Sequence, residues 1–228
     1  MQRISKKEVI MTSTLLQIAH LDGIAESISQ QNFVVWLDQS LTLAINDCHN
    51  DTWDQIMWHV SHGFTWVVGA LMLLYLILKT KPNYKEAVIF LLFVAVMILC
   101  TDQICNIFKH TVQRFRPCWE EAYYYKDWIH IVNGDRGGKY GFFSSHAAIF
   151  FGLAFMSSRL FKNKAYTTAI YLTAVIISYS RIYLGRHYLG DVLVGALAGT
   201  LVAWGTWYFY ERFRNKLMRK HKRNKINE

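Results

Sequence analysis

Proline is scarce in this sequence, and no internal repeat, low-complexity stretch or cleavable signal pattern is visible. Pro82 and Pro117 are the only two among 228 residues. Because proline interrupts helices, its scarcity in a chain with 53% hydrophobic residues predicts long helices rather than a loop-rich fold. The length suits one domain, so we expect one helical body.

Cysteine is scarce too, and its spacing argues against a thiolate metal site. No two cysteines form a CxxC pair, and two of them fall inside an apolar run. We expect all four to be unpaired: Cys48, Cys100, Cys105 and Cys118. A bond between the first and the last of these stays an alternative, because sequence alone does not decide disulfide pairing.

Acidic residues are outnumbered, with 16 Asp and Glu against 25 Lys and Arg, which gives a net charge of +9. Such a balance suits nucleic acid, an anionic membrane or an anionic substrate, so the positions of the charges must decide. Eight of the 25 basic residues lie in the tail 212–228, directly after an apolar run. A basic cluster there usually marks the cytoplasmic end of a membrane span, so we expect no nucleic-acid partner.

Five segments are apolar enough to cross a bilayer, which takes about 20 residues of helix. Mean hydropathy is only +0.13 because concentrated charge separates the apolar runs. The predicted fold is an all-α polytopic transmembrane helical bundle, with spans over 58–78, 87–108, 142–161, 165–183 and 189–210. Gly195 and Gly199 form a GxxxG in the last span, which predicts close helix packing.

Residues 33–45 are harder to place, because Asp38 and Gln39 interrupt an otherwise apolar stretch. An N-terminal interfacial helix fits best, and a sixth span stays an alternative. The loops between the first two spans and between the third and fourth are basic. With Arg159 and the tail they hold 14 of the 25 basic residues on one side, which the positive-inside rule assigns to the cytoplasm.

Three polar clusters interrupt the apolar chain, over 109–117 after the second span, 144–146 at the start of the third and 180–191 between the fourth and fifth. Because successive spans alternate in direction, all three must emerge on one membrane face, opposite the basic loops and tail. The sequence thus predicts one site built from three distant segments.

Lys109, Arg116 and Arg181 belong to these clusters, with Arg114 and Arg186 close by. So much positive charge at a membrane boundary is costly unless an anion compensates it. Arg offers a planar fork for phosphate oxygens and Lys a mobile point charge, so a phosphate is the natural occupant. Lipid head-group binding without chemistry is the alternative interpretation.

Two histidines favour chemistry over binding alone, because an imidazole titrates near neutral pH and serves as nucleophile or proton donor. They are His146 and His187, and Asp191 follows the second by four residues. At helical spacing the carboxylate can accept the proton of one ring nitrogen and leave the other free to attack phosphorus. An ordinary helix pair would show the same spacing.

Ser144 and Ser145 lie where the third span begins, so their hydroxyls and the first-turn N–H groups can cradle an anion. Helix capping alone would also explain them. Asp102, about two turns before Lys109, is expected to pair with a basic residue of the site. The glycine-rich stretch 134–141 predicts a turn-rich loop, with a substrate gate as the alternative.

At these residues the chain resembles the type 2 phosphatidic acid phosphatase family, which shares a superfamily with vanadium haloperoxidases. The family's first motif, KxxxxxxRP, matches Lys109 to Pro117, and its third, SRxxxxxHxxxD, matches Ser180 to Asp191 in full. The second is usually PSGH and here reads FSSH over 143–146. The resemblance covers about residues 38–210.

The resemblance implies roles for the matching positions. His187 would form a phosphohistidine, Asp191 would orient it, and His146 would protonate the leaving oxygen. The phosphoryl group would be bound by Lys109, Arg116, Ser144, Ser145 and Arg181, with Ser145 acting chiefly through its backbone N–H. No metal or other cofactor is implied, and no carboxylate cluster is visible in the sequence.

The resemblance also implies an organisation and an activity. We expect an extension over 1–30, a membrane phosphatase domain over 31–211 and a basic cytoplasmic tail over 212–228, in the inner membrane with the site facing the periplasm or exterior. The substrate would be a lipid phosphate: undecaprenyl pyrophosphate, lipid A, phosphatidylglycerol phosphate or phosphatidate. No obligate protein partner is evident. A lipid phosphotransferase and a non-catalytic lipid-binding or transport protein are the alternatives.

Overall fold

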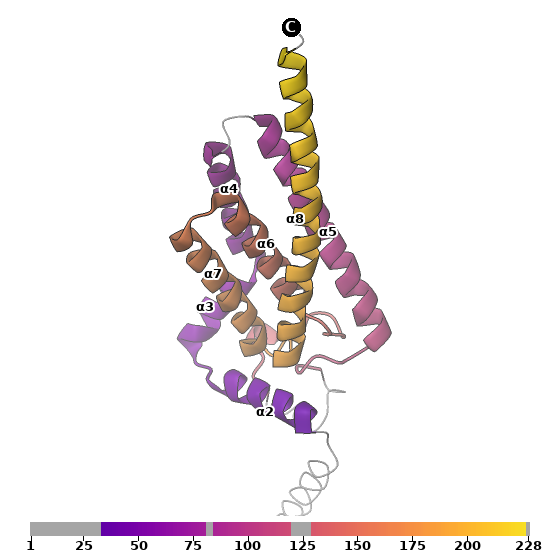
Figure 1. Ribbon diagram of the computed structural model, residues 1–228. Coiled ribbons are helices and arrows are strands. Elements are labelled where there is room, and N and C mark those ends of the chain that lie inside the picture. The colour runs from indigo at the N-terminus through magenta and orange to yellow at the C-terminus, as the bar shows by residue number, and fades with distance from the viewer. Residues whose placement is uncertain (1–32, 81–83, 120–128, 227–228) are drawn as a thin grey trace, which may run out of the picture. The chain divides into compact units, whose positions relative to one another are not determined.

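The computed structural model describes residues 33–80, 84–119 and 129–226 (Figure 1). The predicted extension over 1–30 and part of the loop between the first two predicted spans therefore lie outside the described residues. The chain divides into two compact units, Met1–Leu41 and Thr42–Glu228. The second unit carries every residue of the predicted site.

Helices dominate the described residues, and the all-α prediction is confirmed for them. Phe115 and Tyr140 form an isolated antiparallel bridge, and no strand occurs in these ranges. The helices are α2 (Phe33–Asp47), α3 (Asp51–Ser61), α4 (Gly63–Thr80), α5 (Tyr84–Val112), α6 (Ser145–Phe161), α7 (Lys164–Tyr183) and α8 (Leu189–Ile226), with a short 3-10 turn η1 (Val132–Gly134).

Two helices are long and apolar enough to cross a membrane among the described residues: α5 over Tyr84–Val112 and α8 over Leu189–Arg219. Helices α4, α6 and α7 occupy the positions of the other predicted spans, but α6 has only 17 residues, fewer than the usual 20. Helices thus occur at all five predicted positions, whereas the prediction that all five cross a membrane stays a prediction.

The predicted start of the first span is wrong. The chain leaves the helical conformation at His62, whose φ and ψ are −102° and 158°, so Trp58 belongs to α3 and not to α4. The side chain of His62 stacks on Trp58 and contacts the Trp58 carbonyl at 2.8 Å, which ties the break to the end of α3. The break leaves Ser61, the last residue of α3, to accept a hydrogen bond from Arg181 of α7.

Close packing of α6 against α8 confirms the prediction from the GxxxG pair. A β-carbon on Gly195 would lie 2.5 Å from the Ser144 carbonyl oxygen, and one on Gly199 would overlap the backbone of Ala148. Because only glycine permits backbones to approach this closely, the two helices are in direct main-chain contact. The end of α6 that carries Ser144 is thereby fixed against α8.

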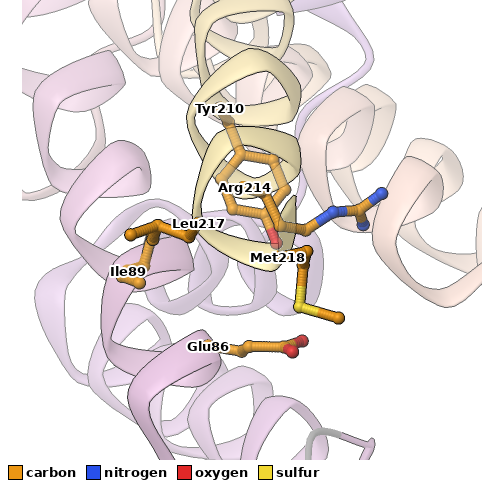
Figure 2. A pocket seen from close by; sticks show the side chains of 6 residues that line it. All are labelled: Glu86, Ile89, Tyr210, Arg214, Leu217 and Met218. Atoms are coloured by element: carbon orange, nitrogen blue, oxygen red, sulfur yellow. The ribbon is translucent and has the colours of Figure 1, made fainter. Parts of the chain in front are cut away.

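The main hydrophobic core lies among α5, α6 and α8, where Phe90, Met97, Met156 and Tyr210 are fully buried. The core ends in a small pocket near the start of α5, remote along that helix from Lys109 (Figure 2). Six side chains of α5 and α8 line it: Glu86, Ile89, Tyr210, Arg214, Leu217 and Met218. Beyond this level α8 continues as one helix to Ile226, so the basic tail is helical in its described part.

Candidate active site

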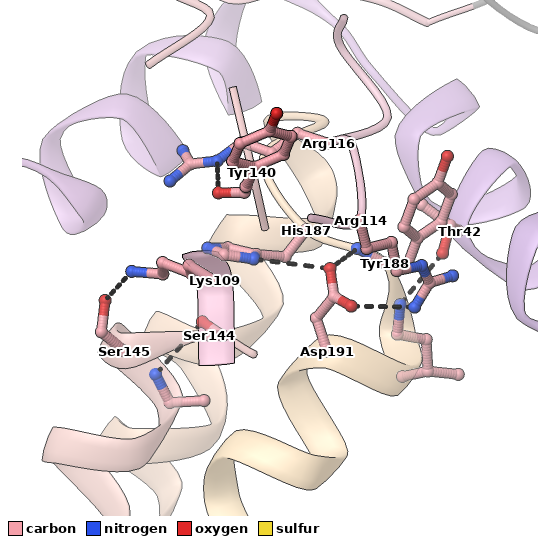
Figure 3. Close-up of polar contacts among 12 residues, drawn as sticks. Thr42, Lys109, Arg114, Arg116, Tyr140, Ser144, Ser145, His187, Tyr188 and Asp191 are labelled. Carbon is pink, nitrogen blue, oxygen red and sulfur yellow. Dashed lines mark hydrogen bonds and ion pairs between the residues drawn. The ribbon is translucent and has the colours of Figure 1, made fainter. Parts of the chain in front are cut away.

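The three predicted polar clusters meet at one end of the bundle (Figure 3). Lys109, in the last turn of α5, donates a hydrogen bond to Ser145 Oγ at 3.2 Å, and Ser145 opens α6. The Ser144 N–H donates to the Asp191 carbonyl at 3.0 Å, which joins α6 to the first turn of α8. Residues more than 80 positions apart in the sequence therefore form one site.

The loop between α5 and α6 is folded back on itself by main-chain bonds. Arg116 N–H donates to the Lys139 carbonyl at 3.1 Å, and Gly141 N–H donates to the Arg114 carbonyl at 2.8 Å. Arg116 Nε also donates to the Tyr140 carbonyl at 3.1 Å (Figure 3). The side chain of Arg116 is thus held by the loop rather than by an acidic partner.

Gly141 brings this loop directly against His187 and Asp191. A β-carbon there would lie 3.1 Å from Asp191 Oδ2 and 3.5 Å from His187 Nδ1. Gly137 has a φ of 62°, a conformation that favours glycine, and lies against the guanidinium groups of Arg116 and Arg186. These two glycines serve close approach, whereas a gating motion stays a prediction.

His187 is carried by a tight turn between α7 and α8. The N–H groups of Arg186 and His187 both donate to the Arg181 carbonyl, at 3.0 and 3.2 Å, and Gly185 supplies the positive φ of 64° that the turn needs. The turn buries His187 to 1% exposure and brings its ring under the basic side chains.

Asp191 faces His187 as the spacing predicts. The distance from His187 Nδ1 to Asp191 Oδ2 is 3.6 Å, longer than a hydrogen bond, and Nδ1 has no hydrogen-bond partner among the described residues. The Tyr188 N–H donates to Oδ2 at 3.1 Å, and Arg114 Nη1 lies 2.8 Å from Oδ1. The carboxylate is therefore held from two other directions while one oxygen points at the ring (Figure 3).

The electrostatic setting keeps His187 neutral. Burial lowers the pKa of His187 well below its ordinary value, and the charges of Arg116, Arg181 and Lys109 lower it further. A neutral imidazole has a free electron pair on one nitrogen. Because Nδ1 faces Asp191, that nitrogen is Nε2.

Three cations of the site form no ion pair with a carboxylate among the described residues: Lys109, Arg116 and Arg181. Arg181 is only 5% exposed, and its Nε lacks a hydrogen-bond partner. The other two predicted arginines are neutralised, Arg114 by Asp191 and Arg186 by Asp135. Burial alone would raise the pKa of Asp135, but the adjacent Arg186 outweighs it and holds that pKa below the ordinary value.

The two serines differ in their contacts. Ser144 is fully buried, and its Oγ accepts from the Ala147 N–H at 3.4 Å, so its hydroxyl caps α6. Ser145 was expected to act chiefly through its N–H, and its hydroxyl also accepts the bond from Lys109. The first turn of α6 lies at the site, and N–H groups in the first turn of a helix can bind an anion.

The remaining candidates from the sequence are Asp102, the four cysteines and any cluster of metal ligands. Asp102, expected to pair with a basic residue of the site, accepts a hydrogen bond from Asn106 at 3.2 Å, and its charge also acts on Lys109. All four cysteines are free, as expected. Cys118 contacts the Arg136 carbonyl, and burial raises the pKa of its thiol. Within the described ranges, no three His, Cys, Asp or Glu side chains gather as metal ligands would.

Comparison with known proteins now decides the family. Residues 89–215, more than half of the chain, match the PAP2 superfamily. The chain belongs to the PAP2 superfamily. This confirms the resemblance to type 2 phosphatidic acid phosphatases.

Relatives of this PAP2 protein include two lipid A 4'-phosphatases. The one from Bacteroides thetaiotaomicron is 38% identical over 179 residues, or 78% of this chain and 77% of the relative. The one from Porphyromonas gingivalis is 33% identical over 185 residues, which cover 80% of this chain and 77% of the relative. Together with the family match, they show that this PAP2 protein is a phosphatase.

Two crystal structures share the fold. Aquifex aeolicus LpxE superposes with a TM-score of 0.57 at 22% identity. The match covers 75% of this chain and 95% of the Aquifex chain. A transmembrane PAP2-type phosphatidylglycerolphosphate phosphatase from Bacillus subtilis superposes with a TM-score of 0.57 at 18% identity. The match covers 87% of this chain and 96% of the Bacillus chain. The PAP2 fold therefore accounts for most of the chain.

Some contacts of the PAP2 site were not predicted from the sequence. Ser61 binds Arg181, and Trp66 packs edge-on against His146 with ring centroids 4.7 Å apart. Both residues precede the family match. The interruption of the apolar run by Ser61 and His62 was the only sequence signal for them.

A second polar network lies behind the turn that carries His187. The buried Asn46 side chain donates to the carbonyls of Tyr183 and His130, at 2.6 and 3.0 Å, and accepts from the His130 N–H at 2.8 Å. Asp54 binds both the Tyr183 hydroxyl and His130 Nε2 at 2.7 Å. The turn that carries His187 is thus anchored to α2 and α3.

Proposed function

We propose that this PAP2 phosphatase removes a phosphate from a lipid and that lipid A is its substrate. Positive charge without an ion-pair partner carries the proposal: three buried or half-buried cations surround a neutral histidine, and none of them forms an ion pair with a described carboxylate. A phosphoryl group supplies the missing negative charge and matches the donors offered. The choice of lipid A follows the two relatives that are lipid A 4'-phosphatases.

In the proposed reaction His187 Nε2 attacks phosphorus, and the bond to the leaving oxygen breaks as the new N–P bond forms. Asp191 accepts a hydrogen bond from the Nδ1–H, which stays on the ring, and stabilises the positive charge that develops there. His146 gives a proton to the leaving oxygen. It then takes a proton from water, which attacks phosphorus and releases inorganic phosphate from His187.

Binding of the phosphoryl oxygens falls to Lys109, Arg116 and Arg181, with the first-turn N–H groups of α6. Their charges match the negative charge that spreads over the equatorial oxygens in the transition state. Because these donors are already in place, little reorganisation accompanies the reaction.

We further propose that five helices span the inner membrane and that the site faces the periplasm or exterior. The polar clusters lie at the end of α5 and the start of α8, whereas the basic tail lies at the far end of α8. A lipid phosphate presented at the membrane surface would thus reach His187 directly from the outer side.

The test is phosphate release by the purified full-length protein in detergent. We expect release from lipid A to exceed release from undecaprenyl pyrophosphate, phosphatidylglycerol phosphate and phosphatidate. His187→Ala should reduce release to background, whereas His110→Ala, at an exposed histidine of α5, should not. Equal release by His187→Ala and the unaltered protein would contradict the proposal.

Product analysis separates hydrolysis from phosphotransfer, since both use a phosphohistidine. With lipid carrying labelled phosphate, we expect the label in inorganic phosphate. Label recovered in a second lipid would identify a phosphotransferase instead.

A further inference from the structure

Arg114 makes the shortest side-chain contact to Asp191, although it is not a fixed position of the motif from Lys109 to Pro117. Its Nη1 lies 2.8 Å from Asp191 Oδ1 as both hydrogen bond and ion pair (Figure 3). The Asp191 side chain is fully buried and that of Arg114 is 26% exposed. The pair therefore lies at the inner edge of the site, where charge interactions are strong.

The structure holds Arg114 in place through both its side chain and its backbone. Its guanidinium lies over the Tyr188 ring, 4.0 Å from the centroid, and its carbonyl accepts the bond from Gly141 N–H at 2.8 Å. A planar guanidinium stacks on an aromatic face as an ammonium does not. Arg114 is thus oriented before it meets the carboxylate.

This contact decides how the Asp191 carboxylate is turned. With Oδ1 held by Arg114, the other oxygen is the one that accepts from the Tyr188 N–H and faces His187 Nδ1 at 3.6 Å. Rotation of the carboxylate would break the charged contact with Arg114. The direction of the oxygen that faces the imidazole is therefore set from outside the His187 and Asp191 pair.

We propose that Arg114 is a positioning residue for phosphoryl transfer: it fixes Asp191 so that Oδ2 accepts a hydrogen bond from the Nδ1–H of His187 and Nε2 stays directed at phosphorus. The inference rests on the proposed function, in which His187 is the nucleophile. In this role Arg114 acts through Asp191 and not by binding the phosphoryl group.

The surrounding charges give the inference a pH signature. His187 is faced by the cations Lys109, Arg116 and Arg181, by the second imidazole of His146 and by the carboxylate of Asp191. Arg114 and Arg116 act in turn on Asp191. Without the Arg114 cation the charge of Asp191 is no longer compensated, so the His187 and Asp191 pair takes up a proton at a higher pH than before.

The experiment compares Arg114→Gln and Arg114→Lys in the full-length protein, with Arg136→Gln as the matched control. Phosphate release from lipid A is followed against substrate concentration and pH. We expect Arg114→Gln to lower kcat by roughly 10- to 100-fold, as loss of a group that orients a histidine does in metal sites. KM should change little, the acid limb should move to higher pH, and Arg136→Gln should resemble the unaltered protein.

Arg114→Lys keeps the charge but loses the planar stack on Tyr188, so we expect it to recover the acid limb and only part of kcat. If Arg114→Gln does not fold, as judged by gel filtration in detergent, Arg114→Lys decides. Full kcat in the lysine variant would then overturn the positioning role.

His187→Ala separates the two proposals. If it still releases phosphate, the proposed phosphohistidine reaction is wrong. If it is inactive while Arg114→Gln keeps both kcat and the acid limb, the reaction stands and the role of Arg114 is overturned. A rise in KM with unchanged kcat would also overturn it, because that would place Arg114 on the substrate.

Discussion

At the scale of single residues, the site depends on a histidine that is buried in its neutral form, with a proton on only one ring nitrogen. In the unfolded chain His187 has the ordinary pKa of about 6.5, whereas burial and three cations hold its pKa well below that value in the folded protein. Above pH 6.5 the ring is neutral in both states. As the pH falls below 6.5, only the unfolded chain takes up the proton, so stability is lost.

We therefore expect the melting temperature in detergent to fall as the pH drops from 6.5 towards the folded-state pKa. A single proton contributes up to about 1.4 kcal/mol per pH unit over that window. His187→Ala should show a shallower dependence, since it lacks this group. Identical slopes for the two proteins would mean that His187 is protonated in the folded state.

Gly141 gives a prediction about geometry, because its neighbours leave no room for a methyl group. Gly141→Ala would place a β-carbon 3.1 Å from Asp191 Oδ2, whereas Gly138→Ala would meet only Arg116 Nη2 at 3.8 Å. We expect Gly141→Ala to lower kcat by about tenfold or more, equivalent to about 1.4 kcal/mol of barrier, and Gly138→Ala to have little effect. Equal rates for both would show that the loop gives way without moving Asp191.

At the scale of helices, the seam between α6 and α8 holds the site together. Gly199→Ala would drive a methyl group into the Ala148 backbone, while Gly205, on the same helix, has nothing within 4 Å of its β-position. We expect Gly199→Ala to destabilise the protein by about 1–3 kcal/mol and Gly205→Ala to be neutral or stabilising, since alanine favours helices. Thermal unfolding of the two variants in detergent checks this, and a stable Gly199→Ala would mean that the helices can separate.

The sequence predicts helices better than their interruptions. The runs that became α5 and α8 are long and apolar, so composition alone identifies them. The break at His62 depends on tertiary contacts, including the bond between Ser61 and Arg181, which no local pattern encodes. The same limit applies to Arg114, whose partner Asp191 lies 77 residues away.

Residues at fixed spacing were easier to predict. The sequence predicts that Lys109, Ser145 and His187 share one site, because alternating spans bring their segments to the same face. The structure brings these residues together, and their chemical roles stay predictions for the experiments above. What sequence spacing does not give is orientation, such as which oxygen of Asp191 faces the ring.

At the scale of the whole molecule, the proposed topology separates the site from the tail by the bilayer. Lys139 beside the site and Lys216 in the tail are both exposed. In a variant whose exposed Cys48 and Cys100 are replaced by serine, Lys139→Cys should react with an impermeant thiol reagent on intact spheroplasts. Lys216→Cys should react only after permeabilisation, and labelling of both from outside would contradict the topology.

Metal independence is a second expectation for the whole enzyme. The proposed reaction uses cationic side chains where many phosphatases use divalent ions, so a chelator should leave phosphate release unchanged. Activity that disappears with the chelator and returns with added divalent ion would contradict this. Dialysed enzyme without chelator serves as the control.

The glycine seam has one more consequence. Because Gly195 and Gly199 set the spacing of α6 and α8 through main-chain contact, the offset between His146 and His187 is fixed where no side chain intervenes. Outward positions such as Leu193 and Leu197 are 61% exposed and take no part in that spacing. Substitutions at such outward positions can therefore adapt the protein to membranes of different thickness or composition without changing the spacing between the two histidines.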